Sequence, residues 1–93
     1  MCRNIHRLYN IDPPVNSEEV RDAALQYVRK VSGSTKPSVA NQEAFEAAVA
    51  AVGEATEVLL AALVTPAPPV SREEMAAKAK ARAEKRYGTS PAA

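Results

Sequence analysis

Cys2 and His6 are the chain's only thiol and only imidazole, and they lie four residues apart. On a helix this spacing would put both side chains on one face, where they could be two ligands of a metal ion. A structural zinc site needs about four ligands, so carboxylates such as Asp12 or a second subunit would have to supply the others. The alternative is a small apolar cysteine and an exposed histidine that bind no metal.

Cys2 could also be a nucleophile, because removal of Met1 would expose an N-terminal cysteine whose amine could act as an internal base. A serine triad is excluded, since the sequence has one histidine and no nucleophile elbow. We therefore favour a protein without enzymatic activity and expect no cofactor.

Several polar residues surround a short loop, residues 32–38, that contains Gly-Ser-Thr-Lys. Together with the N–H groups at the start of the following helix, their side chains could bind an anion. The loop lacks the spacing of a phosphate-binding P-loop, and a solvated helix end is the alternative. The candidate anion-binding residues are Arg29, Lys30, Lys36 and Ser38.

The C-terminal segment is rich in lysine and arginine, which can neutralise nucleic-acid phosphates. No aromatic side chains are interleaved with these cations as a stacking platform. The alternative is a solvated face, or docking onto acidic residues of a partner or of the rest of the chain. The cations are Lys78, Lys80, Arg82, Lys85 and Arg86, and the complementary acidic residues are Glu43, Glu46, Glu54 and Glu57.

The element that must position these groups is a long amphipathic helix, predicted from Asn41 to Val64. Gly53 lies inside it and predicts a close crossing with a neighbouring helix. Thr56 lies within the apolar stripe, where its hydroxyl could bond to the preceding turn or anchor a ligand. The stripe comprises Phe45, Val49, Val52, Thr56, Leu59, Leu60 and Leu63.

The first helix is predicted from a capping box at Asn16 and Glu19 to a stop at Gly33. The short loop after it favours an antiparallel helical hairpin. A Pro-rich linker spans residues 65–70, and a capping box at Ser71 and Glu74 starts a third helix from Arg72 to Tyr87. Residues 1–11 lack a decisive period, and we interpret them as a short helix or an irregular arm.

Composition limits the classes of protein further. Residues 1–71 hold six Lys and Arg against eight Asp and Glu, whereas residues 72–93 hold six against three, so only the tail is basic. A single cysteine is typical of a reducing compartment. We see no signal peptide and no apolar run of the roughly 20 residues that span a bilayer. We therefore expect a cytoplasmic protein without a membrane partner.

Several short motifs resemble a family known as domain of unknown function 2277, over about residues 1–65. The resemblance implies a bacterial, cytoplasmic, all-helical protein with no assigned activity. The sequence departs from the family pattern at Ser34, often aromatic, and at Glu57-Val58, often basic, which affects surface contacts and not the fold. The matching residues are Met1-Cys2-Arg3-Asn4-Ile5, Pro13-Pro14, Ala24-Leu25-Gln26-Tyr27-Val28-Arg29-Lys30, Ser32-Gly33, Lys36-Pro37-Ser38, Asn41, Phe45 and Leu59-Leu60.

We predict an all-α protein with a helical hairpin domain at 1–64, a linker at 65–70 and a basic helix with a disordered end at 71–93. Two helices expose more apolar stripe than one arm can cover, so we expect a homo-oligomer or a protein partner. The leading hypothesis is a small interaction module. The alternatives are nucleic-acid binding through the last helix and a metal or thiol site at the N-terminus.

Overall fold

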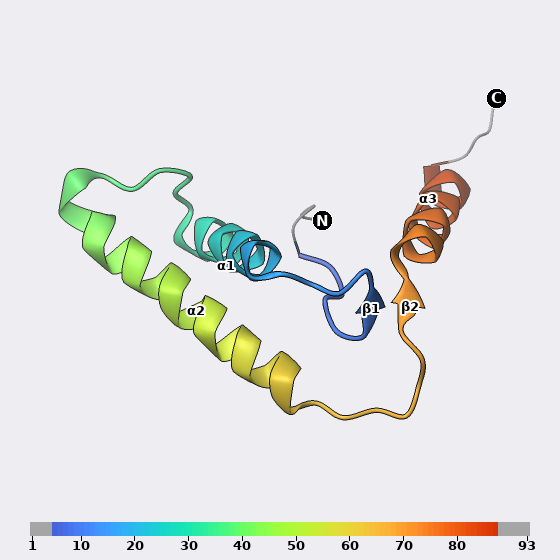
Figure 1. Ribbon diagram of the computed structural model, residues 1–93. Helices are drawn as coiled ribbons and strands as arrows, with labels where there is room; N and C mark the ends of the chain where they lie inside the picture. Colours follow the sequence, from blue (N-terminus) through green and yellow to red (C-terminus); the bar gives the residue numbers. More distant parts are fainter. Residues whose placement is uncertain (1–4, 88–93) are drawn as a thin grey trace.

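The computed structural model describes residues 5–87 and contains three α-helices joined by short irregular segments (Figure 1). The helices are α1 (Ser17–Ser32), α2 (Gln42–Ala62) and α3 (Arg72–Tyr87). A single 3₁₀ turn, Val39–Asn41, leads into α2. Two short strands, β1 (Ile11–Asp12) and β2 (Val70–Ser71), complete the fold. The predicted, mainly helical architecture is confirmed.

Helix α1 has the ends that its sequence predicts. The Asn16 side chain accepts a hydrogen bond from the Glu19 N–H at 2.9 Å, and the Glu19 carboxylate accepts one from the Asn16 N–H at 3.1 Å. At the other end, Gly33 has φ +72°, a left-handed conformation that glycine adopts without strain. Both predicted boundary signals are confirmed.

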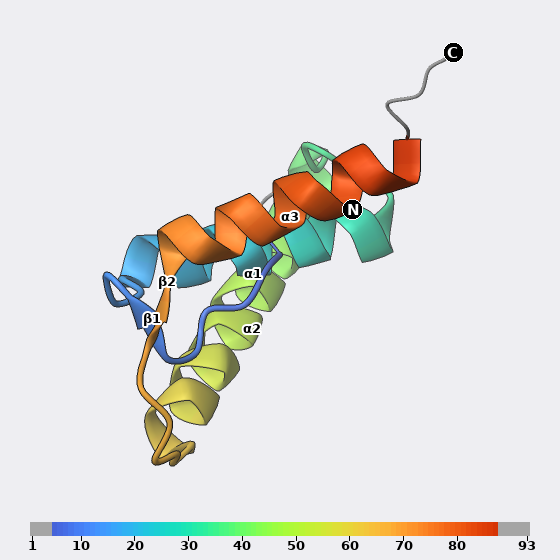
Figure 2. The ribbon, with the colours of Figure 1, turned by 90° about the vertical axis from the view of Figure 1, so that its right-hand side faces the viewer.

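Helices α1 and α2 form the predicted hairpin, and Figure 2 shows that they cross at an angle. The buried residues at this crossing are Ala24, Val28 and Val49, with partly buried Leu25 and Phe45 beside them. A Cβ added at Gly53 would lie 3.8 Å from the Ala24 Cβ, which confirms the predicted close approach. Because crossed helices touch mainly near one point, the core is small and the ends of α2 diverge from α1.

Thr56 lies in this partly buried stripe, and its hydroxyl donates to the Val52 carbonyl at 2.7 Å. The hydroxyl is therefore bonded to the preceding turn of its own helix, as the simpler of the two sequence interpretations predicted.

The N-terminal segment is an irregular arm in the part the structure describes, residues 5–10, so the short-helix interpretation is wrong there. Leu8 of the arm and Ile11 of β1 are buried. Strand β1 then pairs with the end of the linker in parallel, Ile11 opposite Val70 and Asp12 opposite Ser71. This pairing is not predictable from the sequence, because two-residue strands leave no periodic signal.

Helix α3 starts directly after β2, with the Ser71 hydroxyl accepting hydrogen bonds from the N–H groups of Glu73 and Glu74. Figure 1 shows the helix on the far side of the strand pair from α2. Met75 is half-buried, whereas residues 76–85 are exposed. The hairpin therefore leaves most of α3 uncovered.

Candidate functional site

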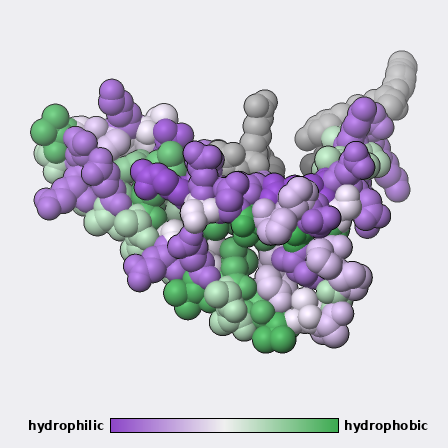
Figure 3. All heavy atoms as spheres, in the orientation of Figure 1, coloured by the Kyte–Doolittle hydropathy of each residue, from purple (hydrophilic) through white to green (hydrophobic). Residues whose placement is uncertain are grey.

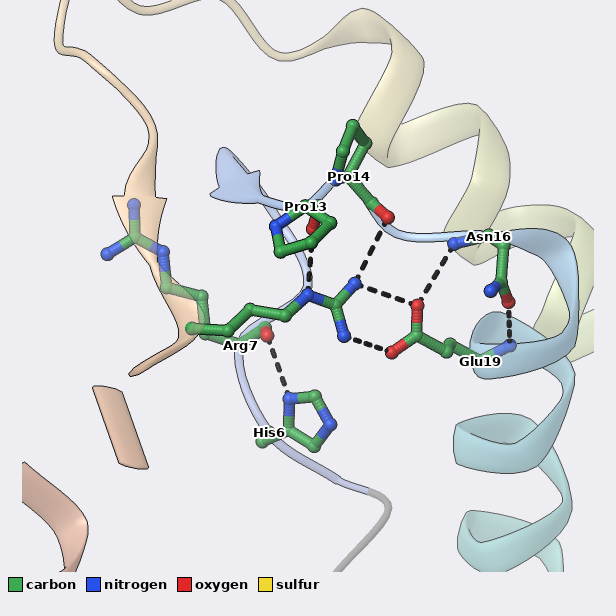
Figure 4. Close-up of polar contacts among 7 residues, drawn as sticks. His6, Arg7, Pro13, Pro14, Asn16 and Glu19 are labelled. Carbon is green, nitrogen blue, oxygen red and sulfur yellow. Dashed lines mark hydrogen bonds and ion pairs between the residues drawn. The ribbon is translucent and has the colours of Figure 1, made fainter. Parts of the chain in front are cut away.

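The most heavily bonded side chain described is Arg72, at the start of α3. Its Nε donates to the Pro13 carbonyl at 2.7 Å and its Nη2 to the Pro14 carbonyl at 3.1 Å. Both terminal nitrogens also bind the Glu19 carboxylate, with Nη2 2.8 Å from Oε1. We call this cluster of Arg72, Glu19, Pro13 and Pro14 the junction (Figure 4).

The junction controls the ionisation of its carboxylate. Hydrogen bonds from Arg72, and next the hydrogen bond from the Asn16 backbone, hold the pKa of Glu19 at about 2, against an ordinary value of 4.5. Partial burial opposes this shift, whereas the charges of Arg72 and His6 add to it. In return, the hydrogen bond to Glu19 raises the pKa of the Arg72 guanidinium. Both groups are therefore charged at neutral pH and satisfy each other.

Asn10, in the N-terminal arm, forms hydrogen bonds with the linker close to the junction. Its φ of +54° is left-handed, a conformation that asparagine tolerates better than most residues. The side-chain amide of Asn10 donates to the backbone carbonyls of Ala67 and Pro68, both at 3.2 Å. The backbone carbonyl of Asn10 accepts a hydrogen bond from the Val70 N–H at 2.9 Å. The arm and the linker are thus joined by polar contacts. The junction and the Asn10 contacts have structural roles and leave little capacity for a ligand.

Of the two predicted metal ligands, Cys2 lies outside the described residues. His6 is exposed, and its Nδ1 donates a hydrogen bond to the Arg7 carbonyl at 2.9 Å (Figure 4). With Nδ1 as the donor, Nε2 is the ring nitrogen that could bind a metal ion. Within residues 5–87 there is no cluster of three or more His, Cys, Asp or Glu that could hold a metal ion. The Cys2–His6 metal site remains a prediction.

Only two of the four predicted anion-binding residues lie at the same groove. Arg29 and Lys36 line a groove of about 460 Å³ between α1, the loop and the start of α2, whereas Lys30 and Ser38 do not. Lys30 is exposed on α1. The Ser38 hydroxyl accepts from the Asn41 side chain at 3.1 Å. We call the groove lined by Arg29 and Lys36 the loop groove.

The predicted nucleic-acid or partner-binding cations lie along α3. The side chains of Lys78, Lys80, Arg82 and Lys85 are exposed, and none forms an ion pair with the residues that the structure describes. The side chain of Arg86 lies outside the described part of the chain. The four exposed cations are therefore available to an acidic partner.

A third surface is apolar and lies over the C-terminal half of α2 (Figure 3). A shallow groove of about 330 Å³ opens there between Tyr27 of α1 and Leu59 of α2. The exposed apolar residues from the end of α2 and just after it, together with Tyr27, form what we call the apolar edge. Its members are Tyr27, Val58, Leu59, Leu63 and Val64, with exposed fractions from 43% to 91%.

A family model described as "Uncharacterized conserved protein (DUF2277)" matches residues 1–78. The chain belongs to this family. The match covers the arm, the hairpin, the linker and the first turns of α3, so both Glu19 and Arg72 of the junction fall within the family region. No curated protein and no solved structure matches the chain.

Two important arginines within the family region were not predicted as site residues. Arg72 was assigned to a helix start, and its partner Glu19 already had a role in a capping box, so nothing in the sequence joined residues 53 positions apart. Arg21 lines the loop groove with Arg29. A spacing of eight residues, about two helical turns, could have placed both on one face of α1.

In residues 5–87, no helix is both long and apolar enough to cross a membrane.

Proposed function

We propose that this protein is a small, non-enzymatic interaction module that self-associates through the apolar edge. The observation that carries the proposal is the groove between Tyr27 and Leu59, together with exposed Leu63 and Val64 directly after α2. Contiguous apolar side chains beside a groove are typical of a surface that is covered by a partner. The helix crossing explains why the chain cannot cover this surface with α1.

The total exposed area supports the same proposal. The chain exposes 7086 Å². A compact monomer of 9.9 kDa would expose about 5,200 Å² by the usual scaling with mass. The radius of gyration is 16.7 Å, against about 12 Å for a compact domain of this length. The chain is therefore more open than a compact monomer of this mass, as expected of a protein that buries surface on association.

Charge distribution favours a second copy of the chain as the partner. Helix α2 carries exposed Glu43, Glu54 and Glu57, and exposed Glu46 beside the loop groove, whereas α3 carries four exposed cations. Within one chain, α3 lies on the far side of the strand pair from α2 (Figure 1), and the described residues form no ion pair between the two helices. In a dimer, α3 of one copy would lie against α2 of the other, where opposite charges meet at the rim of the apolar contact.

The test is the mass of the untagged protein in solution, measured by light scattering and native mass spectrometry across a dilution series. We expect a dimer that dissociates on dilution. Leu59→Glu should raise the dimer dissociation constant by roughly tenfold or more, because it would bury an unpaired carboxylate. The matched control is Ala61→Glu, which adds the same charge at another exposed position of α2, on the glutamate side of the helix.

The circular dichroism of both variants should equal that of the wild type, since Leu59 is already 54% exposed. A monomeric mass at every concentration up to the solubility limit would contradict self-association. Equal weakening by Leu59→Glu and Ala61→Glu would contradict the role of the apolar edge.

The second candidate is nucleic-acid binding by α3, favoured by four exposed cations without ion pairs in the described part of the chain. It predicts binding to duplex or single-stranded DNA or RNA that weakens steeply with added salt. Absent or salt-insensitive binding would eliminate this candidate and leave self-association unaffected.

A further inference from the structure

The loop groove combines an apolar floor with a cationic rim. Its floor is formed by Leu25 of α1 and by Phe45 and Val49 of α2. Val49 is only 3% exposed, and the other two side chains pack against the same buried cluster. This floor belongs to the core of the hairpin and is therefore preformed, so a ligand would not have to order it.

The rim carries three cations. Arg21 and Arg29 lie eight residues apart on one face of α1, and Lys36 comes from the loop. The Nε of Arg29 donates to the Thr35 carbonyl at 3.1 Å, which fixes the loop against α1 and leaves the two terminal nitrogens of the guanidinium for other partners. Within residues 5–87, the side chains of Arg21 and Lys36 form no hydrogen bond or ion pair.

The groove has one opposing charge, the Glu46 carboxylate, which accepts a hydrogen bond from Gln42 at 3.2 Å. Three cations against one carboxylate leave an excess of positive charge. The start of α2 at Gln42 adds partial positive charge at the same end of the groove. The electrostatics therefore disfavour cations and favour an anion.

We propose that the loop groove binds a small organic anion, a carboxylate or phosphate monoester with an aromatic or branched aliphatic body. The body would lie on Phe45 and Leu25, and the anionic group would bind the guanidinium of Arg21 or Arg29, whose paired N–H groups match two oxygens. A volume of about 460 Å³ is in the range of small-molecule pockets. An inorganic anion alone would leave the apolar floor uncovered.

The experiment titrates the full chain with four probes and measures binding by calorimetry and by the NMR shifts of the Phe45 ring and the Leu25 methyl groups. The probes are naphthyl phosphate, naphthoate, neutral naphthalenemethanol and inorganic phosphate. We expect at least one aromatic anion to bind and to shift both side chains. The neutral alcohol and inorganic phosphate should each bind about tenfold more weakly or worse. Which aromatic anion binds more tightly identifies the head group.

Matched charge removals then locate the site. Arg21→Gln and Lys36→Gln should each weaken binding by about fivefold to tenfold, and neither removes a described contact of the fold. Lys30→Gln removes the same charge from an exposed position of α1 outside the groove and should leave the affinity unchanged.

Three outcomes would overturn the proposal. The first is equal affinity for naphthalenemethanol and the anions. The second is an equal loss of affinity in Lys30→Gln and Arg21→Gln, which would indicate general charge attraction. The third is no shift of Phe45 or Leu25 with either anion up to its solubility limit.

Discussion

Arginine side chains at the junction and at the loop groove have opposite surroundings, although both regions include residues of α1. At the junction, the guanidinium of Arg72 donates to two carbonyls and to both oxygens of Glu19. At the loop groove, Arg21 has no polar partner among residues 5–87, and Arg29 uses only its Nε.

The difference separates a structural arginine from a binding one. A guanidinium has five N–H donors in a fixed plane, and the number already occupied decides what it can still bind. Arg72 is occupied by groups of three other residues, Pro13, Pro14 and Glu19, and stabilises their arrangement. Arg21 and Arg29 lie over an apolar floor with free donors, which is the arrangement expected before a ligand binds.

Removing the junction guanidinium should have the largest effect on stability. Arg72→Gln keeps a polar side chain but removes the charged guanidinium, which donates four hydrogen bonds to Pro13, Pro14 and Glu19. The Glu19 carboxylate then loses its main partner. We expect the midpoint of thermal unfolding to fall by several degrees and the Val70 amide to lose protection in hydrogen exchange. An unchanged midpoint would show that the junction does not contribute to the stability of the fold.

Acid should weaken the junction in a defined window. The folded pKa of Glu19 is about 2 and its ordinary value is 4.5, so its contribution is complete above about pH 5 and is lost as the pH falls toward 2. Urea unfolding of the wild type and of Glu19→Gln should therefore differ most at neutral pH and converge across this window. Glu18→Gln is the matched control, since Glu18 is the exposed neighbour on the same helical turn. A constant difference between wild type and Glu19→Gln from pH 7 to pH 2 would contradict the assignment.

The smallest effect on stability is expected at the loop groove. Arg21→Gln removes an exposed charge without a described polar contact, and such changes usually alter the free energy of unfolding by no more than about 0.5 kcal/mol. A urea titration at neutral pH measures this directly. A loss of stability as large as that of Arg72→Gln would remove the distinction between the two regions.

The parts of the fold that were predictable from sequence are those determined by neighbouring residues. Asn16, Glu19 and Gly33 mark the ends of α1 through contacts within a few positions. Gly53 predicted the helix crossing because a residue without a side chain inside a long helix suggests a close neighbour.

The unpredicted parts depend on contacts between distant residues. Ile11 pairs with Val70, and Arg72 binds Glu19, across more than fifty positions. Neither pair leaves a local pattern. An uncovered part of the apolar stripe was expected, but that it includes Leu59 was not evident, because periodicity gives no information on the angle at which another helix crosses the stripe. For the candidate site, Arg29 and Lys36 were identified from charge near a loop, whereas Arg21 required knowledge of which face of α1 borders the groove.

The parallel pairing of β1 with β2 has a consequence for the order of folding. The contacts of α1 with α2 join segments that are close in sequence, and such contacts form early because little chain entropy is lost. The strand pair must close a loop of nearly the whole hairpin, from Ile11 to Val70, before its few hydrogen bonds can form. The hairpin should therefore be the first unit to become protected after dilution from denaturant, and the arm and α3 should be immobilised together in a later step.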